Sequence, residues 1–308
     1  MSDWNLPDRR LTLSFQVFPP KTNGGMRELC GPGGILEQLY TLKPEYISCT
    51  YAPGGIDVGK NLEVMDKILR DGAAAGMTHF TCTGNTREGV LSQLKTYRDR
   101  NVDRLLVFRG REKSQRNGTD SFGSSEALIR FIRQNFGDSF RIAVAGTPES
   151  GADGGSLDAE MEAMRRKCDC GAERIVTRLC WDADAFCRWL EALRGANIWL
   201  PVHVGVLPVV DQADILSLTL AGRGGNVPRE LASLIEQNWI YPNPFVKDPF
   251  DANAEGKKAA FKAAGIDYTL RQISHYGSCG VDGIHLHTGN RFADVARIAR
   301  EAGLADLV

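Results

Sequence analysis

The chain has 308 residues, of which 43% are hydrophobic and 24% are charged, with 37 Lys and Arg residues against 38 Asp and Glu residues. A net charge of -1 excludes the basic excess with which proteins bind nucleic acids or anionic membrane surfaces, so we expect neither partner. Because no apolar stretch reaches the roughly 20 residues of a membrane-spanning helix and the N-terminus carries no secretory signal, the sequence predicts a cytoplasmic protein.

Short runs of β-branched and aromatic residues alternate along the chain with longer segments of helical period. The runs predict strands at residues 11–18, 45–50, 78–83, 104–109, 141–146, 174–179, 199–206 and 283–288. The segments between and after them predict helices at residues 34–42, 61–71, 86–100, 124–135, 156–170, 182–194, 211–221, 228–238, 254–276 and 292–302. Strands that alternate with helices are typical of parallel sheets with helical crossovers.

Side chains suited to helix ends support these boundaries. Thr86 and Ser156 have the hydroxyl group of an N-cap residue. Gly137, Gly171 and Gly195 stand where a left-handed residue commonly ends a helix. These residues therefore mark where the predicted helices begin and end. No Gly/Ser-rich linker divides the predicted units.

Eight β-α units in one chain predict a closed (β/α)8 TIM barrel that forms a single domain over residues 1–308. An open, doubly wound sheet is the alternative fold. A dinucleotide-binding sheet of that kind would carry a glycine-rich turn after its first strand, whereas Phe18-Pro19-Pro20-Lys21 follows the first predicted strand here.

The eight cysteines offer one close pair, Cys168 and Cys170. A single residue between them is too few for the usual zinc knuckle, in which two residues separate the ligands. In a reducing cytosol we expect free thiols and no structural metal.

In a barrel of this class the carboxyl ends of all strands meet at one mouth, where functional side chains gather. These ends are rich in hydrogen-bond donors and poor in carboxylates, and they contain no Ser-His-Asp set, which argues against hydrolytic and metal-dependent chemistry. The donors are Gln16, Thr50, Thr83, Arg109, Arg111, Thr177, Arg178 and Arg291. They suit an anionic, planar ligand such as a flavin or a pterin.

Some of these side chains have a structural alternative. Arg111 can simply neutralise Glu112. His285 and His287 alternate with apolar residues and both point into the predicted barrel, where one of them is expected to be a buried structural histidine. His203, in the apolar seventh strand, is also expected to be structural.

Motifs at the strand ends resemble those of the methylenetetrahydrofolate reductase family, in the same order. The sequence SFQVFPP at residues 14–20 resembles the family's S-F-E-F-F-P-P, and SCTY at 48–51 resembles S-V-T-Y. HFTC at 79–82 with TRE at 86–88 resembles H-L-T-C and T-R-E, and the segment from 280 to 291 resembles G-x-x-G-x-H-F-Y-T-L-N-R. The resemblance extends from residue 11 to residue 291.

The resemblance implies a barrel that binds FAD and passes a hydride from NAD(P)H through the flavin to 5,10-methylenetetrahydrofolate, giving 5-methyltetrahydrofolate. By motif position, it implies flavin contacts for Thr50, His79, Arg109, Gly110, Arg111, Ala145, Thr147 and Lys167. It implies folate contacts for Gln16, Arg178, His287 and Arg291. Association with further copies of the chain, as a homo-oligomer, is compatible with the sequence.

Gln16 stands where the family has the glutamic acid that protonates N10 of the folate. An amide cannot supply that proton. Three answers are open: a water molecule held by Gln16, a substitute acid such as His287 or Glu149, or loss of turnover. Loss of turnover would leave a folate-binding homologue rather than an enzyme, and a methyltransferase barrel would need a methyl-acceptor site that the sequence does not reveal.

Arg111 replaces an aspartate of the family motif near the flavin, and Arg178 replaces a glutamine near the pterin. A cation beside a reduced, anionic flavin stabilises it, whereas a carboxylate opposes it. The substitution at Arg111 therefore favours oxidation of 5-methyltetrahydrofolate as the direction of the reaction.

Overall fold

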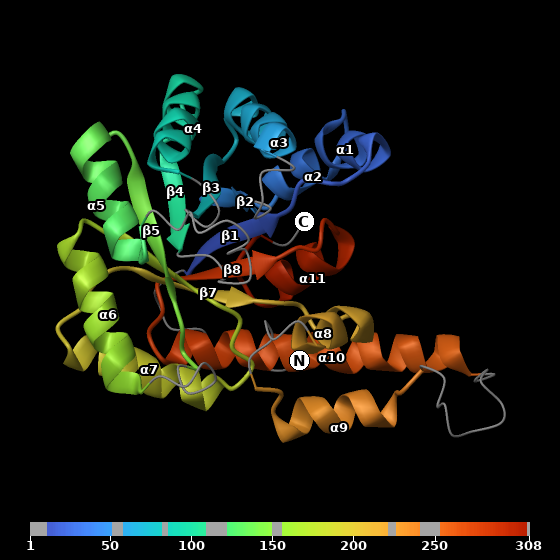
Figure 1. Cartoon of the computed structure of the whole chain (residues 1–308). Coiled ribbons are helices and arrows are strands. Elements are labelled where there is room, and N and C mark those ends of the chain that lie inside the picture. Colours follow the sequence, from blue (N-terminus) through green and yellow to red (C-terminus); the bar gives the residue numbers. More distant parts are fainter. Residues whose placement is uncertain are drawn as a thin grey trace.

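The computed structural model describes residues 11–50, 58–81, 86–108, 122–149, 156–220, 226–240 and 253–306. Eight parallel strands close into a barrel in chain order, with β8 paired to β1, and helices cover the outside (Figure 1). The strands are β1 (Thr12–Val17), β2 (Tyr46–Cys49), β3 (Ala75–Thr81), β4 (Arg104–Phe108), β5 (Arg141–Gly146), β6 (Arg174–Thr177), β7 (Val202–Val206) and β8 (Gly283–His287). The helices are α1 (Asn23–Cys30), α2 (Ile35–Tyr40), α3 (Val58–Asp71), α4 (Arg87–Asp99), α5 (Ser125–Phe136), α6 (Leu157–Asp169), α7 (Ala183–Gly195), α8 (Gln212–Leu220), α9 (Arg229–Gln237), α10 (Ala254–Ser278) and α11 (Ala293–Glu301).

The closed barrel and all eight strands confirm the sequence-based prediction and exclude the open sheet. Thr86 and Ser156 are N-caps, whose hydroxyls accept hydrogen bonds from backbone N–H groups three residues later. The prediction for Gly195 was wrong: it is the last residue of α7, and Asn197, with φ 60°, takes the left-handed position after it. Helix α1 was not predicted, because two glycines in its first turn resemble a loop.

Successive side chains along each strand point alternately outward to the helices and inward into the barrel. Phe15, Ile47 and Leu105 point outward and join the core between the strands and the helices. The neighbouring inward positions at the amino-terminal half of the barrel form a second, smaller apolar cluster. Its buried members are Tyr46, Met77, Leu106, Ala143 and Val176. The barrel interior is therefore packed rather than open at this level.

Nearer the carboxyl ends of the strands, the inward positions become polar. Ser14, Ser48, His79 and His285 are buried there, and Gln16 and His287 follow at the edge of solvent. Since buried polar groups require hydrogen-bond partners, we expect a hydrogen-bond network in this layer in place of apolar packing. The same end of the barrel carries the predicted site.

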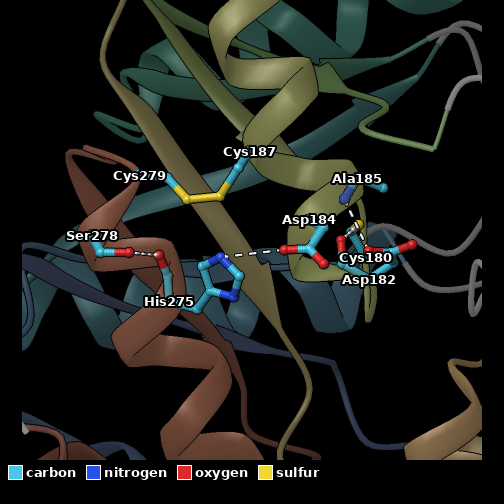
Figure 2. The surroundings of a disulfide bond; sticks show 8 residues. All are labelled: Cys180, Asp182, Asp184, Ala185, Cys187, His275, Ser278 and Cys279. Atoms are coloured by element: carbon cyan, nitrogen blue, oxygen red, sulfur yellow. Dashed lines mark hydrogen bonds and ion pairs between the residues drawn. A yellow bond between two sulfur atoms is a disulfide. The ribbon is translucent and has the colours of Figure 1, made fainter.

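Helix α10 packs against α7, α9 and α11 on the outside of the barrel (Figure 1). A disulfide between Cys187 of α7 and Cys279, the C-cap of α10, joins two of these helices (Figure 2). The expectation of free thiols was wrong for this pair, because the fold brings together two residues 92 positions apart in the sequence. The other cysteines in the described ranges are free. None of the helices described is both long and apolar enough to cross a membrane.

Candidate active site

Gln16 and His287 face each other across the β1–β8 pair at the carboxyl mouth of the barrel. They are register partners, and Gln16 Nε2 donates a hydrogen bond to His287 Nδ1 at 3.3 Å. An imidazole that accepts at Nδ1 carries its remaining proton on Nε2. Burial lowers the pKa of His287 to about 4, so the ring is neutral at pH 7. The pair therefore presents one weak base and one amide, with no carboxylic acid between them.

The turn after β8 fixes the end of β1. Thr288 donates from both its backbone N–H and its hydroxyl to the Gln16 carbonyl oxygen, at 3.0 and 2.8 Å. The Asn290 side chain accepts from Phe18 N at 3.1 Å and donates to Phe18 O at 2.8 Å. Asn290 has φ 54°, a left-handed conformation that asparagine tolerates better than most residues. The end of β1 around Gln16 is thus held through its backbone by the loop that directly follows His287.

Below this pair lies a buried chain of hydroxyls and imidazoles. Ser14 Oγ donates to Ile284 O and lies 2.9 Å from His285 Nδ1. Ser48 Oγ lies 3.1 Å from His285 Nε2 and 3.3 Å from His79 Nε2. One proton arrangement satisfies every contact: His79 donates to Ser48, Ser48 to His285, His285 to Ser14, and Ser14 to the backbone. Burial lowers the pKa of His79 to about 3 and that of His285 well below its usual range, so both rings are neutral.

A second polar group gathers where β5 and β6 end. Lys167 Nζ of α6 donates to Ala145 O at 3.3 Å, and Thr147 N donates to Glu160 Oε1 at 2.9 Å. Burial raises the pKa of Glu160, against the opposing charges of Lys167 and Arg178. The structure therefore brings Ala145, Thr147, Lys167 and Arg178 together around Glu160. Glu160 was not among the predicted site residues, although its carboxylate fixes the backbone N–H of Thr147.

Thr50 and Arg291 border the mouth on either side of Gln16. Thr50 N donates to Val17 O at 3.0 Å, and Asn61 Nδ2 of α3 donates to Thr50 O at 3.1 Å. Arg291 lines the same hollow as His287, and it is paired with Asp214 of α8. An anionic ligand that reaches Arg291 must therefore compete with a carboxylate already in place.

The other candidate acid is engaged elsewhere. Glu149 Oε2 accepts from Asn226 N at 2.5 Å, and its Oε1 accepts from Cys180 Sγ at 3.3 Å. Of the two substitutes considered from the sequence, only His287 contacts Gln16. His203 bonds Tyr46 OH in the barrel interior at 3.1 Å, in keeping with a structural role. The predicted ligands Arg109, Gly110 and Arg111, with Thr83, lie outside the described residues.

Comparison with known proteins adds the family. The profile of the family "Methylenetetrahydrofolate reductase" matches residues 4–303. A protein of Arabidopsis thaliana named "Methylenetetrahydrofolate reductase (NADH) 1" is 28% identical over 310 residues, which cover 96% of this chain and 48% of that protein. "5,10-methylenetetrahydrofolate reductase" of Salmonella typhimurium is 24% identical over 282 residues, covering 92% of this chain and 87% of that protein. The chain spans about half the length of the plant and yeast relatives that match it over most of its length.

Solved structures share the fold. A protein of Clostridium thermocellum described as binding two copies of 5-methyl-5,6,7,8-tetrahydrofolic acid superposes with a TM-score of 0.61 at 11% identity, covering 96% of both chains. A dihydropteroate synthase of Thermus thermophilus superposes with a TM-score of 0.50 at 15% identity, covering 96% of this chain and 94% of that one. At these identities the likeness is one of fold alone.

Proposed function

Because the chain belongs to the methylenetetrahydrofolate reductase family, we propose that it interconverts 5,10-methylenetetrahydrofolate and 5-methyltetrahydrofolate through bound FAD, with NADH or NADPH as the electron partner. The observation that carries the proposal is the hydrogen-bonded pair of Gln16 and His287 at the barrel mouth, beside a hollow that also contains Arg291. This pair combines a proton-accepting group with an amide at the position where the family resemblance places the folate.

The residues of the mouth fit a flavin nucleotide. Its heterocycle needs neutral donors and acceptors, and the buried imidazole of His79 and the half-buried Thr50 and Thr147 are of that kind. Its phosphates need a cation close to backbone groups, and Lys167 reaches the Ala145 carbonyl at the end of β5. When bound, the flavin supplies the hydride chemistry, and the side chains of the protein orient the reactants and manage protons.

We propose that His287 accepts the proton of folate N10. In the oxidative direction that proton leaves as the imidazolidine ring closes, and Nδ1 of the neutral ring is a base that can accept it. The Gln16 amide donates to Nδ1 before the transfer and, after rotation, offers Oε1 as an acceptor for the new N–H. Since burial lowers the pKa of His287 to about 4, the proton-accepting form dominates at pH 7. This ionisation state favours a resting protein that is ready to oxidise 5-methyltetrahydrofolate.

Anaerobic mixing tests the proposal. We expect the purified, full-length chain to be yellow and its flavin absorption to bleach when 5-methyltetrahydrofolate is added without oxygen. Yellow protein that is not bleached by this folate, and does not turn over with NADH or NADPH and 5,10-methylenetetrahydrofolate, would contradict the proposal. Colourless protein that binds the folate would instead identify a folate-binding homologue without turnover.

A further inference from the structure

Four side chains with metal-binding donors meet on the outside of the barrel. Cys187, His275 and Cys279 each offer one donor atom, and these atoms all lie within 4.8 Å of one another. Asp184 extends the group, because its Oδ1 lies 3.5 Å from His275 Nε2 (Figure 2). The group belongs to α7 and α10, whereas the candidate active site is built from strand ends and the loops and helices that follow them. It therefore has no assigned part in the proposed reaction.

The spacing of the four residues matches the geometry of their helices. Asp184 and Cys187 are three positions apart on α7, and His275 and Cys279 are four apart at the end of α10. Side chains at these separations lie on one face of a helix. Each helix thus contributes a pair of donors to the same junction. His275 is also the one histidine of the five in the chain that lies outside the barrel interior.

We propose that, when the Cys187–Cys279 disulfide is reduced, Cys187, Cys279, His275 and Asp184 form a tetrahedral Zn²⁺ site that joins α7 to α10. Two thiolates, an imidazole and a carboxylate are all ligands of zinc in proteins. Metal–ligand bonds of about 2.0 to 2.3 Å place tetrahedral donors roughly 3.3 to 3.8 Å apart. The 3.5 Å between His275 and Asp184 already has that value. The donor atoms of Cys187, His275 and Cys279 lie within 4.8 Å of one another, so shifts of about 1 Å bring His275 and the two sulfur atoms to the same spacing.

The two states of the group exclude each other, because a sulfur atom in the disulfide is not a thiolate ligand. A cellular dithiol converts one state into the other: it donates two electrons and two protons, its own sulfurs form a disulfide, and Cys187 and Cys279 become thiols. Zinc then displaces both thiol protons as the metal–sulfur bonds form. In either state α10 remains joined to α7, next to Tyr276, which donates to Cys180 O in the segment after β6 at 2.5 Å.

Cobalt is the direct probe, because Co²⁺ occupies zinc sites and is coloured. The full chain, freed of any histidine tag, is reduced without oxygen, desalted and titrated with Co²⁺. We expect about one Co²⁺ per chain, with the intense visible bands of tetrahedral coordination and the ultraviolet charge-transfer band of thiolate ligands, both removed by added Zn²⁺. The oxidised protein, in which the disulfide is intact, should show neither band.

Variants separate this site from adventitious binding. Cys279→Ser should weaken cobalt binding at least 100-fold and reduce the charge-transfer band. His275→Ala, which changes a half-exposed residue and leaves the core intact, should weaken binding at least ten-fold. The matched control is Cys30→Ser, which changes a half-buried free cysteine on α1. This variant should bind cobalt as the wild type does. If the reduced wild type shows no tetrahedral cobalt spectrum, the group is a disulfide only. If His275→Ala binds cobalt as the wild type does, His275 is not a ligand, and either result overturns the proposal.

Discussion

The side chains of Gln16 and His287 are joined by a hydrogen bond of 3.3 Å between residues that lie 271 positions apart in the chain. Strand β1 contributes the amide and strand β8 the imidazole, and closure of the barrel is what makes them neighbours. The contact gives the carboxyl mouth a proton acceptor whose hydrogen-bond partner, an amide, cannot ionise. Its chemistry differs from that of a carboxylic acid at the same place, and the difference can be measured.

Replacement of Gln16 by glutamate should restore an acid to the mouth. We expect Gln16→Glu to raise the rate of NAD(P)H-driven reduction of 5,10-methylenetetrahydrofolate at pH 7 by about 10²-fold, the lower range of general acid catalysis. Steady-state assays of the two proteins measure the change. Gln134→Glu, on the exposed face of α5, is the matched control and should leave the rate unchanged. A fall in rate would mean that the site depends on the amide.

The proton-accepting role of His287 predicts a pH dependence. Since its pKa is lowered to about 4, the rate of flavin reduction by 5-methyltetrahydrofolate should stay constant from pH 8 to about pH 5 and decline as His287 is protonated below that. His287→Phe should lower the rate by about 10²-fold at pH 7 and abolish the decline. Anaerobic stopped-flow measurements across this range provide the test. A wild-type rate that rises as the pH falls would contradict the assignment.

The two hydrogen bonds between the Asn290 side chain and the Phe18 backbone should contribute to the stability of the fold. Asn290→Ala removes two hydrogen bonds to Phe18 and places alanine at φ 54°, so we expect a loss of about 2–4 kcal/mol in the free energy of unfolding. Asn290→Gly removes the same bonds without the conformational strain, and it should lose about 1 kcal/mol less. Urea unfolding distinguishes the two variants. Equal losses would show that the left-handed conformation costs nothing here.

The buried histidines should make the fold sensitive to acid. Burial lowers the pKa of His79 and His203 to about 3 and that of His287 to about 4, and it also lowers that of His285. Because an unfolded chain protonates these rings near pH 6.5, it binds more protons than the folded chain between about pH 6.5 and pH 4, and stability falls as the pH falls. Near pH 5, where the four rings together account for close to four extra protons on the unfolded chain, the slope reaches about 5 kcal/mol per pH unit. Urea unfolding at pH 7, 6 and 5 measures it, and a flat profile would contradict it.

The sequence predicted the barrel because the signals for its strands and helices are local. Apolar runs of strand length, helix-capping hydroxyls and eight repeats each leave a signal within about 15 residues, and the topology follows from the handedness of β-α units. Helix α1 was not predicted because Gly24 and Gly25 in its first turn have poor helix propensity. Thr22 compensates by accepting a hydrogen bond from Gly25 N. Tertiary packing of Leu29 then stabilises a helix that propensity alone does not predict.

The site was predictable as a region and not as a set of contacts. Strand ends gave Gln16, Arg178 and Arg291 as candidates because all parallel strands end at one mouth, and the family resemblance added Thr147 and His287. Which candidates touch depends on the register between distant strands and on side-chain rotamers. The pairing of Arg291 with Asp214 likewise depends on how α8 lies against the turn after β8, and no local pattern records it. The disulfide is the extreme case, since it joins cysteines with unremarkable local sequences.

The disulfide itself should contribute to the stability of the oxidised, metal-free protein. Bonding Cys187 to Cys279 closes a loop between residues 92 positions apart, which restricts the unfolded chain and stabilises the folded one by about 2–4 kcal/mol. We therefore expect Cys279→Ser to lower the free energy of unfolding by that amount when both proteins are unfolded in urea with EDTA and without reductant. Under a reductant and EDTA the difference should disappear, because the wild type then also lacks the crosslink. A variant that remains less stable than the wild type by the same amount under reducing conditions would attribute the effect to lost packing of the sulfur atom rather than to the crosslink.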